Sequence, residues 1–306
     1  MNLFWFSFVS AVVLGVSFDR VISLGDSVSD TGNFYELSNH KIPSELYYKG
    51  RLSNGPVWIE HVANKFSAKL NNYPYAGATS DGDEFQVVPG YHIPGCIQQL
   101  QMLKDSHVNE VTCMEDKNIL LHLGFFGNDY VSFRTTITHT LNNLERCLTG
   151  LLNTTKSTHV IVSTSLDPTC IPFIYSLIAP LRYFLRWVSE FVSLAWEAKL
   201  QKLSREYPGV KFYNYDYAEF IQAAANGTLE YTNKHKYILG KSCVTKLSNG
   251  SKTLCPNLQD YLFWDKAHTV KQIHKAMAKS ITDLIRTGSL RFGHILYNSP
   301  IAHQEL

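Results

Sequence analysis

Short apolar runs alternate with amphipathic segments along the chain. The β-branched, apolar runs predict buried strands at residues 21–24, 118–124, 158–165 and 210–215. Apolar residues at helical spacing predict helices at 57–66, 93–103, 137–152, 174–207 (interrupted at Pro180), 217–225 and 270–285. Strands that alternate with helices favour a parallel sheet covered by helices on both faces, so we expect an α/β protein.

Polar or small-residue turns follow the predicted strands. Gly25-Asp26-Ser27 comes after the first strand, Gly77 lies in a turn of small residues, and Asn128 follows the strand at 118–124. Ligands and catalytic groups gather at the carboxyl edge of such a sheet. The alternative interpretation of Ser27 is an ordinary helix cap at the end of a strand.

A carboxylate and a histidine stand three residues apart before the last predicted helix, as Asp265 and His268. At that spacing the carboxylate can hold the imidazole in one tautomer and stabilise the imidazolium. Acyl transfer needs a nucleophile, a base, an orienting acid and donors for an oxyanion, and the turns supply each type. With twelve histidines in the chain, a packed or surface histidine is the competing interpretation.

Four sequence blocks resemble those of the GDSL (SGNH) esterase and lipase family: Gly25-Asp26-Ser27, Gly77 in its small-residue turn, Asn128-Asp129 and Asp265-x-x-His268. The sequence between these blocks resembles the family's lipase/haemolysin-like and plant-lipase-like branch. The resemblance covers residues 20–285 and rests on Gly25-Asp26-Ser27, Asp30-Thr31-Gly32-Asn33, the segment 51–58, Gly77, Asn128-Asp129-Tyr130 and Phe263-Trp264-Asp265-x-x-His268. It implies a three-layer α/β/α, flavodoxin-like fold.

The same resemblance implies the role of each site residue. Ser27 would be the nucleophile, His268 the general base and Asp265 its orienter. The backbone N–H groups of Ser27 and Gly77 and the side-chain amide of Asn128 would form the oxyanion hole. Two positions depart from the family pattern: Phe126 replaces a glycine of the third block, and Thr269 follows the histidine where a proline is usual.

The residues around Ser27 and the short separation of Asp265 from His268 exclude the α/β-hydrolase fold. Its nucleophile elbow requires Gly-x-Ser-x-Gly, whereas this chain has Gly25-x-Ser27-x-Ser29. That fold also places its acid and its histidine far apart, and here Asp265 and His268 are close neighbours.

Composition and charge limit the classes of binding partner and cofactor that we expect. Hydrophobic residues make up 45% and charged residues 18% of 306 positions, as in folded globular proteins. The formal net charge is +2 and no long run of like charge occurs, so nucleic acid is a poor partner. The cysteines and histidines lack metal-binding spacing, and we expect no metal and no organic cofactor.

Several features favour the secretory pathway. Residues 1–17 have the shape of a signal peptide, which leaves 18–306 as a single domain. The cysteine count is even (Cys96, Cys113, Cys147, Cys170, Cys243 and Cys255), and Cys243 with Cys255 forms the easiest local disulfide, the other pairings staying open. Glycosylation sequons occur at Asn153, Asn226 and Asn249. The final residues, 303–306, resemble a retrieval signal, so we expect the endoplasmic reticulum lumen and a retrieval receptor, or otherwise secretion.

An apolar segment at 174–196 carries too many charges for a spanning helix and predicts an amphipathic one, with lipid contact through Tyr183, Phe184, Trp187 and Phe191 as a hypothesis. The motifs together predict a serine-dependent carboxylic-ester hydrolase of lipase, phospholipase or esterase type, acting through an acyl-enzyme. Acetyl groups on a glycan are the alternative substrate. A non-catalytic glycan- or lipid-binding protein on the same fold, or a chaperone-like partner, are the alternative functions.

Overall fold

A mostly parallel sheet forms the centre of the molecule. The computed structural model describes residues 15–109, 118–125, 127–131, 135–163, 167–246 and 251–296. Within them the central sheet has the strand order β10-β11-β5-β4-β3-β1-β2. Its strands are β1 (Arg20–Gly25), β2 (Lys69–Asn72), β3 (Ile119–Gly124), β4 (His159–Ser163), β5 (Lys211–Tyr215), β10 (Ser289–Leu290) and β11 (Gly293–Leu296). Strands β1 to β5 pair in parallel, and β11 pairs antiparallel with β5.

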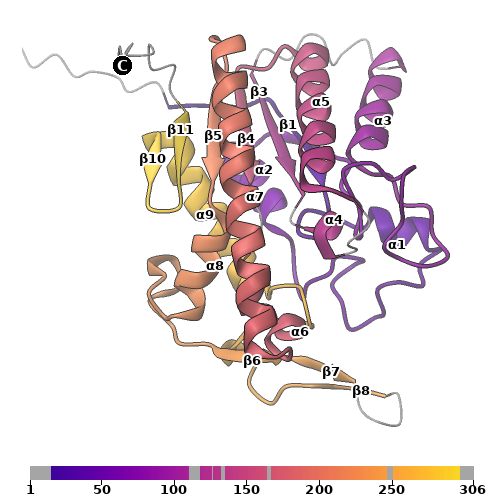
Figure 1. Ribbon diagram of the computed structural model, residues 1–306, viewed down its shortest axis with the longest axis vertical. Helices are drawn as coiled ribbons and strands as arrows, with labels where there is room; N and C mark the ends of the chain where they lie inside the picture. Colours follow the sequence, from indigo (N-terminus) through magenta and orange to yellow (C-terminus); the bar gives the residue numbers. More distant parts are fainter. Residues whose placement is uncertain are drawn as a thin grey trace, which may run out of the picture.

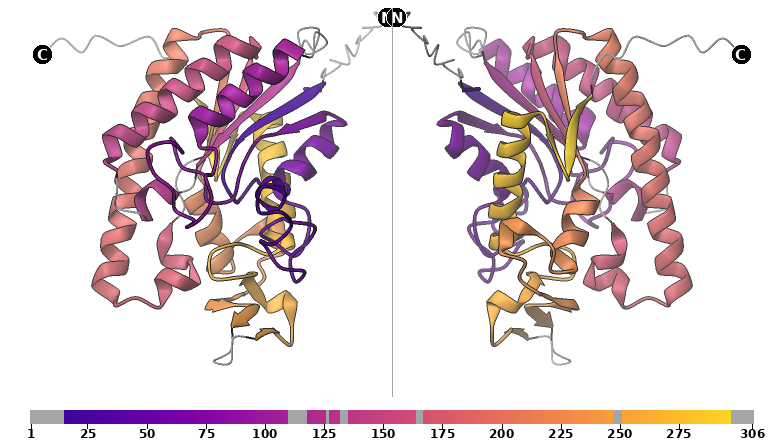
Figure 2. Two further views of the ribbon diagram at one scale, coloured as in Figure 1. Left: turned by 90° about the vertical axis from the view of Figure 1, so that its right-hand side faces the viewer. Right: turned by 90° about the vertical axis from the view of Figure 1, so that its left-hand side faces the viewer.

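Helices cover both faces of this sheet, as expected. One face packs against α2 (Trp58–Phe66), α8 (Tyr217–Ala225) and α9 (Lys271–Thr287). The other face packs against α3 (Cys96–Asn109), α5 (Ile137–Thr155) and α7 (Ala179–Glu206). Figures 1 and 2 show the two helix layers on opposite sides of the sheet. Alternate residues of β1 serve the two cores: Val21 faces the first, and Ile22 and Leu24 face the second.

Smaller elements gather beyond the carboxyl edge of the parallel strands, at the lower end of Figure 1. They are α6 (Pro172–Tyr175), β6 (Ile238–Ser242), β7 (Val244–Lys246), β8 (Lys252–Leu254) and β9 (Tyr261–Phe263). Two short helices, α1 (Asn33–Leu37) and α4 (Asn128–Val131), follow β1 and β3. Single 3-10 turns occur at Pro168–Cys170, Glu230–Thr232 and Leu258–Asp260.

The structure differs from the sequence-based expectation at several places. The polar segment 226–256, for which no strand was predicted, contains the pair β7–β8 and the strand β6, which pairs with β9. The helical region expected at 174–207 is interrupted next to Pro180, as predicted: α6 ends at Tyr175, and α7 begins at Ala179 with Pro180 in its first turn, where a missing N–H is harmless. Helix α3 begins only at Cys96, after Pro94 and Gly95, and runs on to Asn109. The antiparallel strand β11, which lies between β5 and the edge strand β10, was not predicted.

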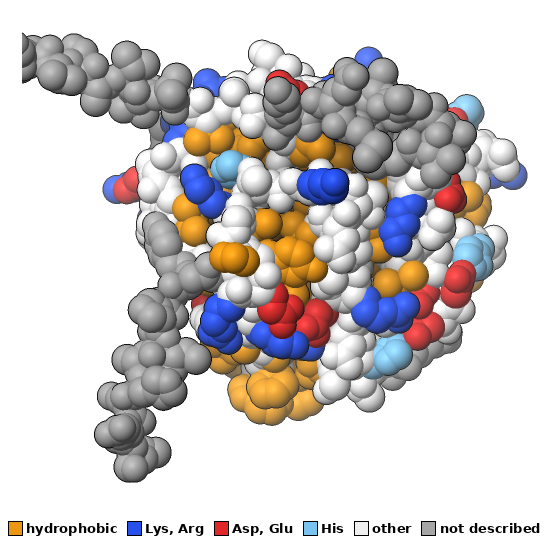
Figure 3. All heavy atoms as spheres, turned by 90° about the horizontal axis from the view of Figure 1, so that it is seen from above, with side chains coloured by type: hydrophobic (Ala, Val, Ile, Leu, Met, Phe, Trp, Pro, Cys, Tyr) orange, Lys and Arg blue, Asp and Glu red, His pale blue; other side chains and the backbone are white. Residues whose placement is uncertain are grey.

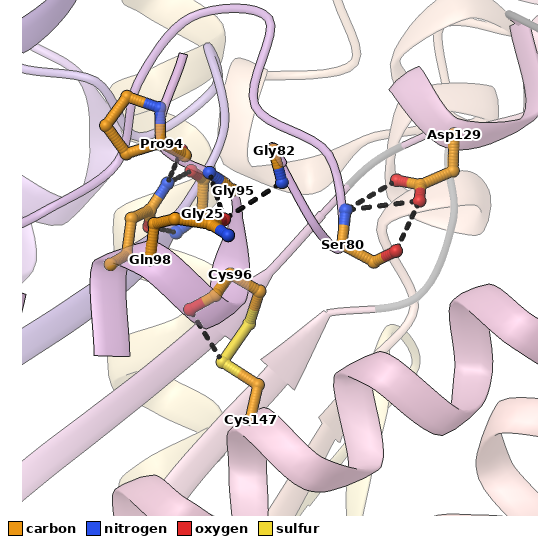
Figure 4. The surroundings of a disulfide bond; sticks show 10 residues. Gly25, Ser80, Gly82, Pro94, Gly95, Cys96, Gln98, Asp129 and Cys147 are labelled. Atoms are coloured by element: carbon orange, nitrogen blue, oxygen red, sulfur yellow. Dashed lines mark hydrogen bonds between the residues drawn. A yellow bond between two sulfur atoms is a disulfide. The ribbon is translucent and has the colours of Figure 1, made fainter. Parts of the chain in front are cut away.

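Two disulfides are present among the described residues. Cys96–Cys147 joins α3 to α5, and Cys243–Cys255 links the residue before β7 to the residue after β8 (Figure 4 shows the first). The prediction for Cys243 and Cys255 is confirmed. Cys170 is a free thiol, and Cys113 lies outside the described residues.

Other predictions concern the ends and the surface. Residues 1–14, Asn249 and the final segment 303–306 lie outside the described residues, whereas Phe18 is already part of the core. Asn153 on α5 and Asn226 after α8 are exposed. On the face in Figure 3, basic and acidic side chains are interspersed. No described helix is long and apolar enough to cross a membrane.

Candidate active site

Ser27, His268 and Asp265 form one hydrogen-bonded chain. Nε2 of His268 lies 2.9 Å from Oγ of Ser27. Nδ1 of the same ring lies 2.9 Å from both carboxylate oxygens of Asp265. Ser27 stands in the turn after β1, and the other two residues stand in the loop between β9 and α9. The structure therefore brings together residues separated by 241 positions in the chain.

The acid and the histidine alter each other's ionisation. Burial lowers the pKa of His268, but the charge and hydrogen bonds of Asp265 outweigh it, so that pKa is raised above its ordinary value. Burial raises the pKa of Asp265, but the charge and hydrogen bonds of His268 prevail and lower it. The two side chains keep 20% and 18% of their surface exposed, so solvent reaches the pair. Asp265 therefore stays ionised and stabilises a proton on the imidazole.

The strand end before Ser27 is held in place by a residue that the sequence did not identify. The side-chain amide of Gln99, buried on α3, accepts from the N–H of Gly25 (2.8 Å) and donates to its carbonyl (2.9 Å). Gly25 lies opposite Gly124 of β3, and a Cβ on Gly25 would lie 2.5 Å from the Gly124 carbonyl oxygen. Only glycine fits there, which explains the first residue of the Gly-Asp-Ser block.

Two buried carboxylates shape the turn that carries Ser27. Asp26 accepts from the N–H of Val28 (3.1 Å). Asp30 accepts four backbone N–H groups, those of Gly32, Asn33, Phe34 and Ala76. Burial raises the pKa of Asp30 to about 6 even though these donors favour its charged form. The contact with Ala76 fastens the Gly77 turn to the Ser27 turn.

The other two residues predicted to form the oxyanion hole, Gly77 and Asn128, lie close to each other. The side-chain amide of Asn128, at the start of α4, donates to the carbonyl of Ala78, next to Gly77 (2.9 Å). Gly77 has a φ of +84°, and a Cβ there would lie 2.7 Å from Val88, so this backbone requires glycine. Within the described part of the chain, the backbone N–H groups of Ser27 and Gly77 have no acceptor.

The carboxylate of Asp129 secures this arrangement. It is buried and accepts from both the N–H (3.0 and 3.1 Å) and the hydroxyl (2.6 Å) of Ser80, as Figure 4 shows. A third donor is the hydroxyl of Thr140 on α5 (3.3 Å). The second and third blocks are thus tied to each other. Phe126, the departure from the family pattern, lies outside the described residues.

The segment 51–58 positions the loop that carries His268. Ser53 Oγ donates to the carbonyl of Thr269 (2.9 Å), and Asn54 Oδ1 accepts from the N–H of Lys271 (2.7 Å). Gly55 faces Lys271 so closely that a Cβ would lie 2.6 Å from that side chain. Thr269, in the position where the family usually has proline, is buried under this contact.

Tyr47 is a further residue of the site that the sequence analysis missed. Its hydroxyl donates to Oδ2 of Asp265 at 2.8 Å. Burial, then the charge of Asp265, raises the pKa of this phenol, so it remains a donor at physiological pH. Its ring meets Trp264 edge to face at 6.2 Å. Nothing in the sequence around Tyr47 marks it, because the contact spans 218 positions.

Two other histidines are structural. Nδ1 of His122 on β3 is hydrogen-bonded to Oγ of Ser23 (2.9 Å), and Nδ1 of His274 on α9 accepts the N–H of Trp58 (3.3 Å). Burial lowers the pKa of each to about 3, so both are neutral. Among the described residues, no group of three or more histidine, cysteine, aspartate or glutamate side chains is arranged to hold a metal ion.

Comparison with known proteins decides the family. The family model of GDSL-like lipases and acylhydrolases matches residues 21–281, which include every member of the site. The chain belongs to this family. As a GDSL-like lipase/acylhydrolase, it is an enzyme that hydrolyses ester bonds.

Similarity to individual relatives is low; it is long for a plant protein, whereas the chain spans only about a third or less of two bacterial relatives. GDSL esterase/lipase At1g31550 of Arabidopsis thaliana is 25% identical over 92% of this chain and 88% of its own length. Phosphatidylcholine-sterol acyltransferase of Aeromonas hydrophila is 32% identical, over 38% of this chain and 34% of its own. The match to thermolabile hemolysin of Vibrio parahaemolyticus, 27% identical, covers 38% of this chain and 26% of that protein.

Two solved structures align with most of this chain at low sequence identity and low TM-score. A GDSL-like lipase from Bacteroides thetaiotaomicron covers 87% of both chains at 12% identity, with a TM-score of 0.40. A catalytic mutant of Axe2, an acetylxylan esterase from Geobacillus stearothermophilus, covers 93% of this chain and 98% of its own at 16% identity, with a TM-score of 0.41.

Proposed function

We propose that this GDSL-family enzyme hydrolyses its ester through an acyl-enzyme on Ser27. The observation that carries the proposal is the continuous hydrogen-bonded chain from Asp265 through His268 to Oγ of Ser27. A serine hydroxyl is a weak nucleophile until an adjacent base takes its proton. His268 is placed to take it, and Asp265 is placed to stabilise the imidazolium that results.

The reaction proceeds in two halves. Oγ of Ser27 attacks the ester carbonyl carbon while its proton passes to Nε2 of His268. The tetrahedral intermediate collapses, and His268 gives that proton to the departing alcohol, which leaves the acyl group on Ser27. Water then attacks the acyl carbon and His268 accepts its proton. Ser27 Oγ leaves, regains the proton and releases the carboxylic acid.

The negative oxygen of each intermediate needs donors. We assign this role to the N–H groups of Ser27 and Gly77, which lack other acceptors within the described residues, and to the side-chain amide of Asn128. That amide is oriented by its bond to Ala78, and Asp129 fixes the adjoining backbone. Losing one such donor lowers turnover by about 100-fold to 1,000-fold.

We infer that lipid acyl esters are the substrate class. Two of the partial relatives carry the names phosphatidylcholine-sterol acyltransferase and hemolysin, and both names concern lipid or membrane. The described surface beside the catalytic loop is rich in exposed aromatic and aliphatic side chains, which suits an apolar acyl chain better than a sugar. Acetyl esters on glycans remain the rival outcome of the assay below.

The test compares p-nitrophenyl esters from acetate to palmitate, a phosphatidylcholine and an acetylated xylan. Ser27→Ala and His268→Ala should abolish hydrolysis of whichever esters the unaltered chain cleaves. Ser289→Ala, an exposed serine on β10, is the matched control and should keep full activity. A fluorophosphonate probe should add its mass to the peptide that contains Ser27. Equal activity of the unaltered chain and Ser27→Ala, or no activity on any ester, would refute the proposal.

A further inference from the structure

Helix α7 is apolar on two opposite faces. Its inner face buries Val192, Trp196, Leu200 and Leu203 in the core. Its outer face carries Tyr183, Phe184, Trp187, Phe191 and Leu194, of which Trp187 is 61% and Leu194 is 69% exposed. A surface helix normally has one apolar stripe directed at the core and a polar opposite face. The second stripe therefore has no partner within the described part of the chain.

The outer stripe is continuous. The rings of Phe184 and Trp187 have centroids 6.2 Å apart, and the rings of Trp187 and Phe191 are stacked at the same distance. An apolar surface of this kind marks an interaction site rather than scattered surface residues.

Neighbouring elements extend the stripe. Of the fourteen large hydrophobic side chains that are exposed among the described residues, twelve lie here, and only Leu37 and Ile42 lie elsewhere. Leu181 is a sixth on α7, and the other six are Phe173, Tyr175, Ile178, Ile238, Leu239 and Leu254. The ring of Tyr175 packs against Gly240 of β6, where a Cβ would lie 2.3 Å away, so α6 and β6 form one surface.

Basic side chains predominate on this surface, where Glu190, between Trp187 and Phe191 on α7, is acidic. Residues 171–187, 234–245 and 251–256 contain no aspartate or glutamate. They contain Arg182, Arg186, Lys234, Lys236, Lys241 and Lys252. Arg186 is paired with Glu190 (2.8 Å), and Arg182 lies over the ring of Tyr175. We call the twelve apolar side chains and these six basic ones the basic aromatic surface.

The basic aromatic surface adjoins the catalytic loop. The N–H of Phe173 donates to the carbonyl of Lys266 at 3.1 Å, and Lys266 directly follows Asp265. Figures 1 and 2 show α6, β6 and the start of α7 at the same end of the molecule, beyond the carboxyl edge of the sheet. A planar partner seated on this surface would thus lie beside the loop that carries Asp265 and His268.

We propose that the basic aromatic surface docks the enzyme on an anionic lipid bilayer and so presents membrane-lipid esters to Ser27. Tryptophan, tyrosine and phenylalanine with flanking basic residues are typical of helices that lie in a membrane interface. Lysine and arginine near such an interface are attracted to anionic lipid headgroups. A second copy of the chain is a poorer occupant, because a two-fold contact would bring the same basic residues face to face. This inference rests on the proposed function for the identity of the substrate.

The test measures co-sedimentation of the full chain with phosphatidylcholine vesicles, with and without 30% phosphatidylserine as a chosen composition. Ser27→Ala serves as background so that no lipid is hydrolysed. Phe184→Ser with Trp187→Ser should lower the partition coefficient at least tenfold. Leu37→Ser with Ile42→Ser removes apolar side chains that are 38% and 39% exposed outside the basic aromatic surface, and it should leave binding unchanged.

The charge requirement has its own pair of variants. Lys236→Glu with Lys241→Glu should reduce binding to the anionic vesicles and not to the neutral ones. Lys69→Glu with Lys211→Glu is the control. It changes exposed lysines at the amino ends of β2 and β5, away from the carboxyl ends of the strands, and should have no effect.

Each surface variant is also made with Ser27 intact, and its hydrolysis of p-nitrophenyl acetate, a soluble ester, is measured. This second assay separates the docking inference from the proposed function. Loss of vesicle binding with unchanged soluble-ester hydrolysis supports both. Vesicle binding that is equal in the Phe184/Trp187 variant and its background would overturn the docking surface and leave the esterase standing. A dimer in sedimentation velocity that the same variant dissolves would also overturn it, because the occupant would then be a second copy.

Discussion

The hydroxyl of Tyr47 donates a hydrogen bond of 2.8 Å to Oδ2 of Asp265, the carboxylate that also holds His268. Both carboxylate oxygens of Asp265 are therefore held by donors besides His268 Nδ1. Oδ2 accepts from the Tyr47 hydroxyl, and Oδ1 accepts from the backbone N–H groups of Ala267 and His268. A carboxylate held in this way has one orientation toward the imidazole. Tyr47 is thus a positioning residue, which acts on the reaction through Asp265.

Removing that hydroxyl should slow turnover without weakening substrate binding. A hydrogen bond to a charged group contributes about 1.5–3 kcal/mol, so Tyr47→Phe should lower kcat by about 10-fold to 100-fold while KM stays nearly constant. Steady-state kinetics on a soluble ester measure both constants. Tyr48→Phe, at the adjacent position, is the control and should be neutral. A raised KM with unchanged kcat would show that Tyr47 binds substrate instead.

The pH dependence of activity should report the Asp265–His268 pair. Asp265 raises the pKa of His268, and only neutral imidazole can accept the Ser27 proton, so kcat/KM should fall as pH drops through that raised pKa. Asp265→Asn removes the charge that raises the pKa. The acidic limb of the profile should therefore move to lower pH, while the plateau falls by about 1,000-fold or more. An acidic limb that stays in place would assign it to another group.

Gly55 should be intolerant of even one methyl group. A Cβ there would lie 2.6 Å from Cβ of Lys271, at the start of α9, and Ser53 and Asn54, which directly precede Gly55, hold the His268 loop. Gly55→Ala should therefore displace that loop and reduce kcat. Gly209→Ala adds the same methyl group where nothing lies within 4 Å, and it should keep kcat and thermal stability. Equal kinetics for both variants would show that the loop tolerates the displacement.

The elements that the sequence predicted are those with strong local patterns. Helix α8 has the predicted bounds, 217–225, because its amphipathic run begins directly after Asp216, whose side chain caps it. The nucleophile turn and the Asp265–His268 loop were also predicted, since each motif is contiguous and contains its own spacing. The prediction that these segments converge came from the resemblance to a family, and the 2.9 Å contact between His268 and Ser27 agrees with it.

The residues and strands that were not predicted from the sequence depend on contacts between distant segments. Tyr47 and Gln99 are ordinary residues in their own surroundings, and their roles follow from the positions of Asp265 and Gly25 in the folded chain. Strand β11 is only four residues long and is defined by its pairing with β5. Strands β7 and β8 lie in a polar segment with little apolar alternation, where the disulfide between Cys243 and Cys255 brings their ends together. Local patterning carries no signal for such features.

The disulfide between Cys96 and Cys147 should contribute more to stability than the one between Cys243 and Cys255. The first closes 51 positions and the second 12, and a longer closed loop removes more entropy from the unfolded chain. By that relation, Cys96→Ala with Cys147→Ala should lower the free energy of unfolding by about 4 kcal/mol, and Cys243→Ala with Cys255→Ala by about 3 kcal/mol. Guanidinium unfolding of both double variants measures the difference.

Peptide mapping without reduction, combined with a count of free thiols in the denatured chain, checks that the cross-links exist. At most two of the six cysteines, Cys170 and Cys113, should react with a thiol reagent. Cys96 and Cys147 are buried, and the N–H of Cys96 donates to the carbonyl of Thr79, two residues after Gly77 (2.9 Å), so their removal should also lower activity at temperatures well below the unfolding midpoint. The Cys243 and Cys255 variant is the comparison for that effect. If the Cys96 and Cys147 variant is as stable as the unaltered chain, the constraint between α3 and α5 comes from packing alone.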